Sequence, residues 1–424
     1  MSRRKPEVSI LFSASEEYTT DGRDFSLYLG ACLCHAGWSR VHLVGWSSEK
    51  TDNDNAIHYE DDKARESFFP YGVNKPVPFN RRQCTFNSVS VVRDSQLIII
   101  CVNCNETQAC SRKVKSLLPE RHDCCVISFQ YGTKNSLTGH HSFPKDSRYP
   151  VLDGAVGLLV SRVMTGKGPA FCALNQGCLV LSRLTKEHSD NGQKFLNLLE
   201  TANIPILYRR NITPHTWGVV MWRQFEPLCA LTGLDASALL ANRNARILYA
   251  TMVSEAYQVL KLASRKTKWE ANLHCTGAGI LLQIIAMCTK GGLARALPLV
   301  VALPDFIFRP LSGFLLPVKK GAKPPLLEDL QAHRKTALKW QLEELVNVAT
   351  NQRCAMPVST RVFHLLQLAI QNAQGSPCIS NKDLYFKAGS PDAVAKRANI
   401  FTLKFIGICG VIIVLALFIW HYEL

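Results

Sequence analysis

The residues of this chain whose type could support metal or redox chemistry are its sixteen cysteines. Cys101 and Cys104 form a CxxC pair, and Cys110 follows soon after. A structural zinc site requires four well-placed ligands, and the irregular cysteine spacing provides no such set. The CxxC pair also ends an apolar run, LIIICVNC, so we expect ordinary buried thiols and no metal centre.

The net charge of the chain indicates which classes of binding partner it favours. The chain has 49 Lys and Arg against 33 Asp and Glu, a formal net charge of +16. Such an excess suits an anionic membrane surface, an anionic cofactor or an acidic partner. The basic residues are scattered and no binding motif with interleaved aromatic residues is present, so we expect no nucleic-acid partner. His140 and His141 lie in a polar loop, where we expect solvated side chains.

The elements that must position these residues alternate between strand and helix patterns in the N-terminal half. A buried strand is expected over residues 7–12, a helix over residues 25–37 and a strand over residues 41–46. This order is a strand–helix–strand unit. Residues 1–210 are therefore predicted to form an α/β domain with a mainly parallel sheet and an antiparallel edge. Its further expected elements are strands over residues 88–92, 97–102 and 125–132, a basic helix over residues 107–118, and β-rich segments up to about residue 184.

The pattern changes to helices from Trp217 onward, because apolar residues then recur three or four apart. Residues 211–374 are predicted to form an all-α domain. Within it, residues 291–325 are apolar, but their prolines and polar residues argue against a membrane span. This stretch is either a helical insert packed on its own domain or a surface that faces a membrane or a partner. Residues 375–399 are rich in Gly, Ser, Pro and Lys and are predicted to be a linker.

The C-terminal segment has the composition of a membrane anchor. Residues 405–420, FIGICGVIIVLALFIW, carry no charge, and the apolar segment extends back past Lys404. A helix of this length spans about 24 to 30 Å, close to the hydrocarbon thickness of a bilayer. Lys396 and Arg397 add positive charge to its N-terminal side, as on a cytosolic flank. We predict a single-pass tail anchor over residues 400–420, on a cytosol-facing organelle membrane, either the mitochondrial outer membrane or the endoplasmic reticulum. The alternative is a buried C-terminal core helix.

Three sequence blocks resemble one enzyme family. Residues 324–366 carry a Leu-x-Asp helix and then a long helix that leads to a Pro-x-x-Thr-Arg-hydrophobic turn. Residues 219–225, VVMWRQF, are similar to the Trp-x-Lys segment that opens the catalytic helix, and residues 128–135, SFQYGTKN, to the Gln-Asn-Gly turn at the domain cleft. In this order, the blocks resemble the ketopantoate reductase (2-dehydropantoate 2-reductase) family. The resemblance implies an α/β plus all-α fold: a degenerate Rossmann-like domain, a helical 6-phosphogluconate-dehydrogenase-like C-terminal domain, and here one added transmembrane helix.

The resemblance also implies an NADP site at the first strand–helix turn. A Rossmann enzyme needs glycines there, because the backbone approaches the pyrophosphate closely. Ser13 and Ser15 stand at the first two glycine positions, and the two glutamates that follow would repel a pyrophosphate. An insertion before Gly22 also lengthens the turn. The remaining family positions for the cofactor and the cleft turn fall on Trp46, where the family carries an arginine for the 2′-phosphate, Asn103, where it carries a lysine, Gln130, Tyr131 and Gly132.

The catalytic positions that the resemblance implies are altered as well. The family's catalytic lysine, a general acid toward the keto oxygen, falls on Gln224, which donates hydrogen bonds but cannot deliver a proton. The late acidic position is retained as Asp329. The other substrate positions fall on Leu228, Thr232, Pro325 and Ala337. A small shift of the alignment would offer Lys266, Lys268, Lys335 or Lys339 as a replacement acid.

Two functions compete on these residues. The first is a membrane-tethered pseudoenzyme that has lost NADP and acts as a scaffold or interaction module for protein partners. The second is a divergent NADP-dependent 2-dehydropantoate (2-keto acid) reductase with a relocated acid. A sensor that binds a metabolite in the interdomain cleft is a third possibility. The combined loss of the glycines and the lysine favours the pseudoenzyme.

Overall fold

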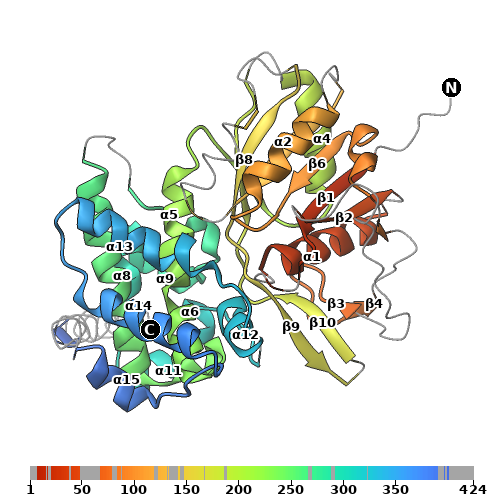
Figure 1. The fold of residues 1–424 in the computed structure, drawn as a ribbon. Coiled ribbons are helices and arrows are strands. Elements are labelled where there is room, and N and C mark those ends of the chain that lie inside the picture. Colours follow the sequence, from red (N-terminus) through yellow and green to blue (C-terminus); the bar gives the residue numbers. More distant parts are fainter. Residues whose placement is uncertain are drawn as a thin grey trace, which may run out of the picture.

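The computed structural model of the chain consists of an N-terminal α/β domain beside a C-terminal helical domain (Figure 1). The described residues are 7–15, 17, 21–37, 40–47, 67–78, 84–86, 88–118, 123–130, 132, 142–143, 148–166, 168–185, 189–265, 270–287, 292–321, 323–389, 396 and 399–400.

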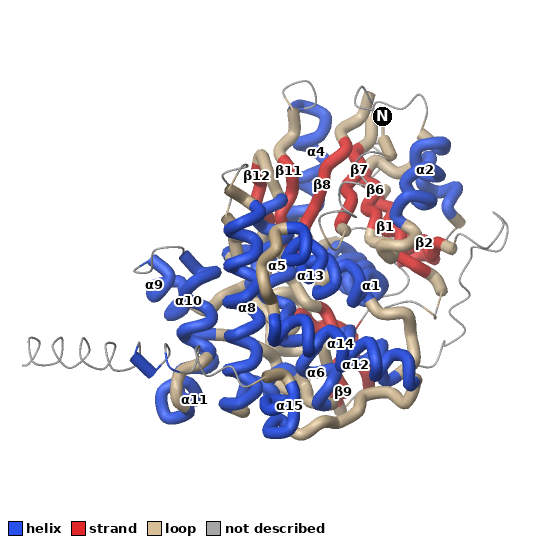
Figure 2. Tube along the Cα trace, turned by 60° about the vertical axis from the view of Figure 1, so that its left-hand side comes forward, coloured by secondary structure: helices blue, strands red, loops and turns tan. Residues whose placement is uncertain are grey.

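The α/β domain is built on an eight-stranded sheet of order β12-β11-β8-β7-β6-β1-β2-β5 (Figure 2). From β5 to β8 all neighbours are parallel, and β11 then pairs antiparallel with β8. The run β5-β2-β1-β6-β7-β8 is the strand order of a doubly wound dinucleotide-binding fold. The strands are β1 (Val8–Ser13), β2 (Val41–Trp46), β5 (Cys84–Phe86), β6 (Leu97–Ile100), β7 (Cys125–Phe129), β8 (Val151–Val156), β11 (Leu179–Ser182) and β12 (Ile206–Arg209).

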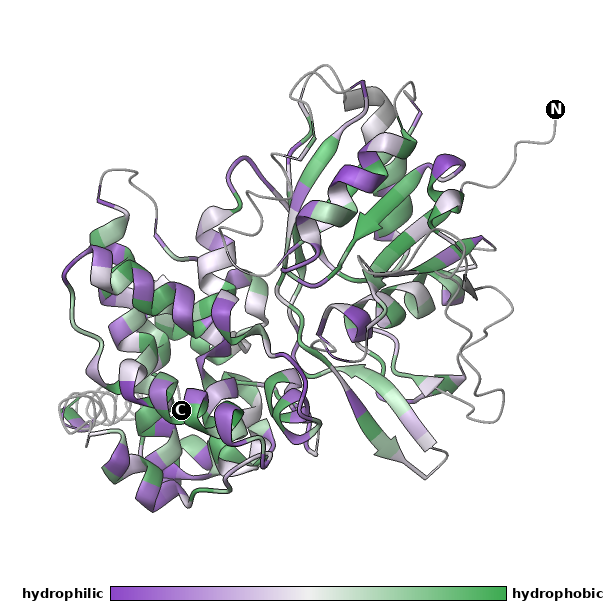
Figure 3. Cartoon of the chain, viewed as in Figure 1, coloured by the Kyte–Doolittle hydropathy of each residue, from purple (hydrophilic) through white to green (hydrophobic). Residues whose placement is uncertain are grey.

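Helices cover both faces of this sheet because its strands are hydrophobic on both sides (Figure 3). On one face, α1 (Asp21–His35) and α4 (Ser189–Glu200) pack against alternate residues of the strands, such as Ile10. On the other face, α2 (Thr107–Leu117) packs against the intervening residues, such as Leu11. The alternating strand and helix patterns of the sequence therefore correspond to the layers of the domain.

A smaller sheet of order β4-β3-β10-β9 extends from the first domain. Its longest part is the antiparallel hairpin of β9 (Val160–Thr165) and β10 (Gly168–Ala173), visible below the main sheet in Figure 1. The short strands β3 (Ser67–Phe68) and β4 (Val77–Pro78) continue it.

The helical domain is organised around α8 (Arg243–Ala263), whose apolar face lies in the largest hydrophobic cluster. A nearly continuous helical stretch formed by α5 (Thr213–Trp222), the 3-10 turn Arg223–Phe225 and α6 (Glu226–Thr232) contacts the α/β domain. The other helices are α7 (Ala236–Ala241), α9 (Ile280–Met287), α10 (Gly292–Val301), α11 (Asp305–Leu315), α12 (Pro325–Gln331), α13 (Leu342–Asn351), α14 (Pro357–Asn372) and α15 (Asn381–Lys387), and the short 3-10 turns are His274–Thr276 and Ala337–Trp340.

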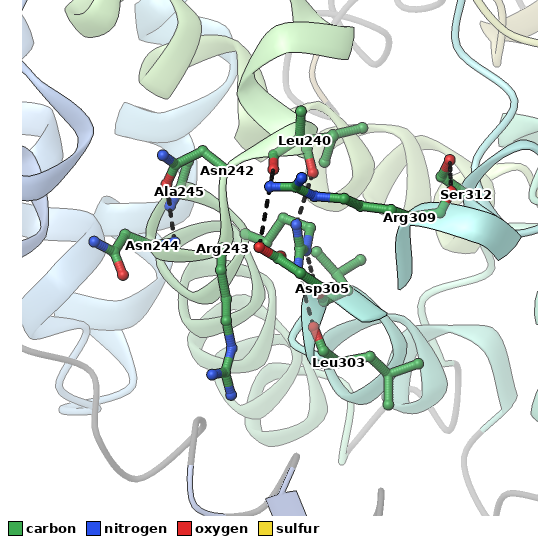
Figure 4. Close-up of polar contacts among 12 residues, drawn as sticks. Leu240, Asn242, Arg243, Asn244, Ala245, Leu303, Asp305, Arg309 and Ser312 are labelled. Atoms are coloured by element: carbon green, nitrogen blue, oxygen red, sulfur yellow. Dashed lines mark hydrogen bonds and ion pairs between the residues drawn. The ribbon is translucent and has the colours of Figure 1, made fainter. Parts of the chain in front are cut away.

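A fully buried arginine fixes the ends of several of these helices. Arg246 donates hydrogen bonds to the carbonyl oxygens of Leu240 (3.0 Å), Val301 (2.9 Å) and Leu303 (2.9 Å) and to the carboxylate of Asp305 (2.7 Å). Figure 4 shows Leu240, Leu303 and Asp305 converging at this point. The carbonyl groups at a helix C-terminus lack partners within the helix. The guanidinium supplies those partners and carries positive charge where the helix dipole favours it.

The two domains meet through close backbone contacts. The backbone N–H of Cys178, in the first domain, donates to the carbonyl oxygen of Cys275 in the second (2.8 Å). The side chain of Asn175 donates to the carbonyl oxygen of Thr276 (2.7 Å). A Cβ atom on Gly177 would lie 2.8 Å from the Cys275 oxygen, so the approach requires glycine. Neither domain can shift here without breaking backbone hydrogen bonds.

Three segments test predictions made from the sequence. The strand expected over residues 88–92 is wrong: Val89–Arg93 is a 3-10 helix, begun by the Ser88 side chain, which accepts a hydrogen bond from the Ser90 backbone. Within residues 291–325, α10 packs with most of its apolar residues buried, and α11 leaves Phe306 and Phe314 exposed. The expected linker 375–399 contains α15, because Leu384 and Ala388 are buried against the domain.

Within the described residues, no helix is long and apolar enough to cross a membrane. The predicted anchor, residues 400–420, lies outside the described residues except for Ile400.

Candidate functional site

The switch point of the sheet lies between β1 and β6, where the strand order reverses. Ligands of doubly wound sheets bind outside the carboxyl ends of the strands at such a point. Here Ser13 ends β1, and its hydroxyl accepts a hydrogen bond from the backbone N–H of Asn103 (2.6 Å) and donates one to the Glu106 carboxylate. Glu106 is 3% exposed and directly precedes α2. A buried carboxylate therefore lies at the switch point, bonded to the first position of the predicted phosphate-binding turn.

The cleft turn contributes two of the predicted positions. Gln130 is buried, accepts a hydrogen bond from the Thr107 hydroxyl (2.8 Å) and donates to the Ile100 carbonyl oxygen (3.4 Å). Gly132 has a φ of 77° and faces the helical domain, where an added Cβ would lie 2.6 Å from the Glu344 carboxylate. Ser13, Asn103 and Gln130 are thus brought together beside α2, and Gly132 marks the domain boundary.

Ser15 and Trp46 lie at the edge of this arrangement. The Ser15 hydroxyl accepts a hydrogen bond from the backbone N–H of Glu17 (3.3 Å), which closes a local turn. Trp46 ends β2 and is buried in the hydrophobic cluster on the α2 side of the sheet. The position at which the family resemblance places an arginine for a 2′-phosphate is therefore taken by a packed indole.

The N-terminus of α1 would receive the pyrophosphate in a Rossmann enzyme, because its free N–H groups and dipole attract anions. In this chain it carries two carboxylates of its own, Asp21 and Asp24, each 1% exposed. Asp24 pairs with Arg162 of β9 (3.2 Å), and Asp21 pairs with Arg223 of the helical domain. Burial raises the pKa of Asp24 despite the Arg162 guanidinium, which lowers it. The first turn of this helix thus carries two buried carboxylates, each paired with an arginine from another part of the chain.

The acidic residues continue into the helical domain. Arg223, besides contacting Asp21, pairs with the fully buried Glu226. Burial raises the pKa of Glu226 to about 7, although Arg223 lowers it. Burial likewise raises the pKa of Glu328 to about 7, and the Asp24 carboxylate adds to the effect. The seam between the domains therefore holds a cluster of acidic groups, of which two have pKa values near neutrality.

The two predicted catalytic positions do not meet in an open cleft. Gln224 is 1% exposed, and its amide donates back to the Val220 carbonyl oxygen of its own helical stretch (2.8 Å). Asp329 is fully buried and pairs with Arg334 (3.2 Å). Of the lysines considered as replacement acids, Lys335 pairs with Glu17 (3.1 Å), and Lys339 lies 5.3 Å from the Trp340 ring centroid. Lys266 and Lys268 lie outside the described residues.

A cavity of about 10 Å³ remains between the cleft turn and α5, which is room for about one water molecule. Arg223 is the ionisable side chain among the described residues that line it. A guanidinium stays protonated in proteins, so it can orient an oxyanion but cannot deliver a proton to a keto oxygen. The other lining residues are Gln130, Gly132, Ala155, Val156, Thr216, Val219, Val220, Trp340 and Gln341.

The cysteines considered from the sequence as candidate metal ligands lie in the protein interior. Cys101, Cys104 and Cys110 are buried cysteines, and the first two lie in the apolar run that predicts buried thiols. Burial raises the pKa of Cys101 to about 12, which suppresses the reactive thiolate. In the described part of the chain, no group of three or more His, Cys, Asp or Glu side chains is placed to hold a metal ion. His140 and His141 lie outside it.

Sequence reasoning missed the residues that fill the switch point and the helix N-terminus. Asp21, Asp24, Glu106 and Arg223 were not singled out. A weak signal existed, because Asp21 and Asp24 stand at the start of an apolar helical pattern and Arg223 precedes the position of the family's lysine. The pairing between Asp21 and Arg223 spans 202 positions, which no local pattern can indicate.

The residues present at this site do not fit a dinucleotide. Glu106 places a carboxylate at the switch point and the first turn of α1 carries two more, and negative charge at these positions opposes a pyrophosphate by Coulomb repulsion. One feature of the fold type is retained. A Cβ on Gly22 would overlap the carbonyl oxygen of Cys101, so Gly22 provides the close helix–strand packing that the third glycine of the dinucleotide motif provides.

The fold is that of a two-domain chain, a Rossmann-like domain followed by a helical domain. A family model described as "Ketopantoate reductase PanE/ApbA C terminal" matches residues 211–370. The resemblance to the ketopantoate reductase family predicted from the sequence is thereby confirmed. No curated protein matches the chain significantly in sequence.

Solved structures share the fold at low sequence identity. A PanE/ApbA family ketopantoate reductase from Ralstonia eutropha JMP134 is 16% identical and aligns with a TM-score of 0.55, over 87% of this chain and 99% of its own. A D-mandelate dehydrogenase, solved with NADH and anilino(oxo)acetate, is 14% identical with a TM-score of 0.58, over 87% of this chain and 100% of its own. A 2-dehydropantoate 2-reductase from Geobacter metallireducens GS-15 is 14% identical with a TM-score of 0.54, over 85% and 99%.

Proposed function

We propose that this chain is a non-catalytic protein on the ketopantoate reductase fold, which has lost NADP binding and acts as a membrane-tethered scaffold. The hydrogen bond from Ser13 to the buried Glu106 carboxylate carries the proposal. A dinucleotide would have to displace this carboxylate or force its protonation, and Glu106 lies beside the backbone that would cradle the phosphates. Asp21 and Asp24 oppose the same anion from α1.

The described residues that line the small cavity include no general acid, which supports the same proposal. Reduction of a keto acid needs a general acid within hydrogen-bond reach of the keto oxygen. At the family's lysine position stands Gln224, which is turned to its own helical stretch. The neighbouring cation, Arg223, is already engaged by Asp21 and Glu226. Gln224 is thus used within its own helical stretch, and Arg223 is used to hold the two domains together.

The tether is proposed from the sequence of residues 400–420 and from the formal net charge of +16, which favours an anionic surface. The expected location is the cytosolic side of the mitochondrial outer membrane or the endoplasmic reticulum, and the expected partners are proteins. Two arginines at the centre of the segment, Ile413→Arg and Leu415→Arg, oppose insertion. The double variant should be released by alkaline carbonate, whereas the unchanged chain should stay in the membrane pellet.

The test of lost catalysis is calorimetric titration of the full chain, in a mild nonionic detergent, with NADPH and NADH. We expect no binding at millimolar cofactor, and no NADPH consumption with ketopantoate or other 2-keto acids. Micromolar binding with turnover would overturn the proposal in favour of a divergent NADP-dependent 2-dehydropantoate reductase. The variant Ser13→Gly with Glu106→Gln removes the buried charge while keeping most of the volume. A gain of NADPH affinity in this variant would locate the obstruction at the switch point.

A further inference from the structure

A second, much larger pocket lies on the seam between the domains. Its volume is about 580 Å³, within the range typical of small-molecule sites. The first domain contributes residues 69–74, which follow β3, and residues 173–176 at the end of β10. The helical domain contributes α7, α11 and the segment 316–320. We call it the seam pocket. None of the family positions discussed above lines it, so it is distinct from the dinucleotide crevice.

The wall of the seam pocket combines aromatic surface with positive charge. Phe69, Tyr71 and Phe308 provide aromatic rings. The charged side chains among its described lining residues are Arg309, Lys319 and Lys320, and none of these lining residues is acidic. A concave, partly apolar surface with several cations and no carboxylate favours a ligand with the opposite charge and an apolar body.

Lys319 is held in place by a backbone hydrogen bond and an aromatic ring, and no carboxylate of the described residues forms an ion pair with it. Its backbone N–H donates to the Leu174 carbonyl oxygen (3.0 Å), which ties segment 316–320 to the end of β10. Its ammonium lies 3.6 Å from the centroid of the Phe69 ring. Burial lowers the pKa of Lys319, because the described residues provide no carboxylate partner to offset desolvation. A bound anion would supply that missing charge.

Arg309 forms the opposite side of the charged wall. Its guanidinium contacts Asp305 (3.1 Å), and this carboxylate also pairs with the buried Arg246. Arg309 is therefore not fully neutralised by Asp305. Arg309 and Ser312 lie one turn apart on α11, as Figure 4 shows. The Ser312 hydroxyl lines the pocket and can donate to an anionic oxygen as an alternative to its bond with the Arg309 carbonyl oxygen (2.9 Å).

The first domain adds a rigid aromatic side. The Tyr71 hydroxyl donates to the Gln176 carbonyl oxygen (3.0 Å), which joins segment 69–74 to the end of β10. The rings of Phe69 and Tyr71 are thereby held across from α11. Preformed aromatic walls reduce the conformational entropy lost when a ligand binds.

We propose that the seam pocket binds a small anionic molecule, a phosphate monoester or a carboxylate attached to an aromatic or apolar body. The anion contacts Lys319, Lys320 and Arg309, and the apolar body lies against Phe69 and Tyr71. Because the ligand touches both domains, binding stabilises their present arrangement. The proposal is independent of NADP loss, since it rests on different residues.

The test is calorimetric titration of the full chain in nonionic detergent with phenyl phosphate and with indole-3-acetate. Inorganic phosphate lacks the apolar body and benzyl alcohol lacks the charge. We expect at least one aromatic anion to bind at least about tenfold more tightly than either control. Binding should weaken as salt concentration rises. Equal affinity for phenyl phosphate and inorganic phosphate, or no binding of either aromatic anion at millimolar concentration, would overturn the proposal.

Variants assign the binding to the pocket. Lys320→Gln removes an exposed cation at the pocket wall, and Lys319→Gln removes the half-buried one. Each should lower the affinity severalfold, whereas Lys382→Gln, an exposed lysine of α15 outside the lining, should bind as the wild type does. Should Lys319→Gln fail to fold, Lys320→Gln alone decides, because its side chain is solvent-exposed. Unchanged affinity in Lys320→Gln together with Arg309→Gln contradicts the proposal.

Two sources of the anion are separated by one further probe. Dihexanoyl phosphatidic acid presents a lipid phosphate, and tighter binding of this probe than of phenyl phosphate indicates a lipid headgroup. Tighter binding of phenyl phosphate indicates a soluble metabolite. NADPH also carries phosphates and rings, so any NADPH binding is repeated in Lys320→Gln. Affinity lost in that variant belongs to the seam pocket, and affinity retained belongs to the dinucleotide crevice, which tests the proposed function separately.

Discussion

Arg223 donates a hydrogen bond to the carboxylate of Asp21 across the boundary between the two domains. The arginine is 3% exposed and the carboxylate 1%, so water screens this pair very little. In a dinucleotide-binding protein, the first residue of this helix would face a phosphate. Here the same helix end is bound to the second domain through the Asp21 carboxylate.

Removal of Arg223 should destabilise the protein strongly. Arg223→Met leaves Asp21 and Glu226 buried without their cation, and breaking a buried pair costs about 3–5 kcal/mol. Chemical denaturation of the full chain measures the loss. The neutral combination Arg223→Met, Asp21→Asn and Glu226→Gln should recover much of it, because no charge then remains unpaired. Equal stability of the single variant and the wild type would show that the cluster contributes nothing.

The buried Arg246 should be equally sensitive. Arg246→Met removes the guanidinium that donates hydrogen bonds to three carbonyl oxygens and to Asp305. Each buried group left without a hydrogen bond costs about 1–3 kcal/mol. Arg246→Lys keeps the charge but not the forked geometry, so an intermediate loss is expected. Arg309→Met is the control. The Arg309 side chain is 63% exposed, so its ion pair with Asp305 should contribute under about 1 kcal/mol to stability. Thermal unfolding should rank the three variants in that order.

The acidic cluster should make stability fall as pH rises. The pKa of Glu226 is about 7 in the folded state, against an ordinary value of 4.5, so between these values the folded protein holds a proton that the unfolded chain has released. The free energy of unfolding therefore decreases from about pH 4.5 to about pH 7.

Glu226→Gln cannot titrate, so its melting temperature should change less with pH over this window. The double variant with Glu328→Gln should flatten the profile further, because the pKa of Glu328 is also raised to about 7. Melting curves at several pH values between 5 and 7, compared with the wild type, provide the measurement. An identical slope in all three proteins would refute a role for these groups.

The close packing at Gly22 should tolerate no side chain. In Gly22→Ala the new methyl group overlaps the Cys101 carbonyl oxygen, and the start of α1 must shift from β6. Overpacking of this kind costs about 1–3 kcal/mol. Gly166→Ala is the matched control, since an added Cβ there meets no described atom within 4 Å. Denaturation midpoints should separate the two variants clearly, and a stable Gly22→Ala protein would mean that α1 moves freely at this end.

The sequence by itself determined the layers of the protein, because they follow from local periodicity. The mainly apolar residues 41–46 predict a strand with the same bounds as β2. The helix predicted over residues 107–118 ends one residue later than α2 does. The change from strand to helix patterns placed the domain boundary near residue 210, and α5 begins at Thr213. The short apolar run at 88–92 was misjudged, since a few β-branched residues fit a strand or a 3-10 helix and the Ser88 cap decided between them.

Only the tertiary structure decided which side chains meet. Asp21 and Arg223 lie 202 positions apart, and Ser13 and Glu106 lie 93 apart, so their pairing depends on how the domains and strands are arranged. Sequence patterns place an arginine at the surface, yet Arg246 is buried because the C-terminal ends of α7 and α10 direct three carbonyl groups toward it. Charge pairing and burial are properties of the packed chain, and periodicity records only which face of each element is apolar.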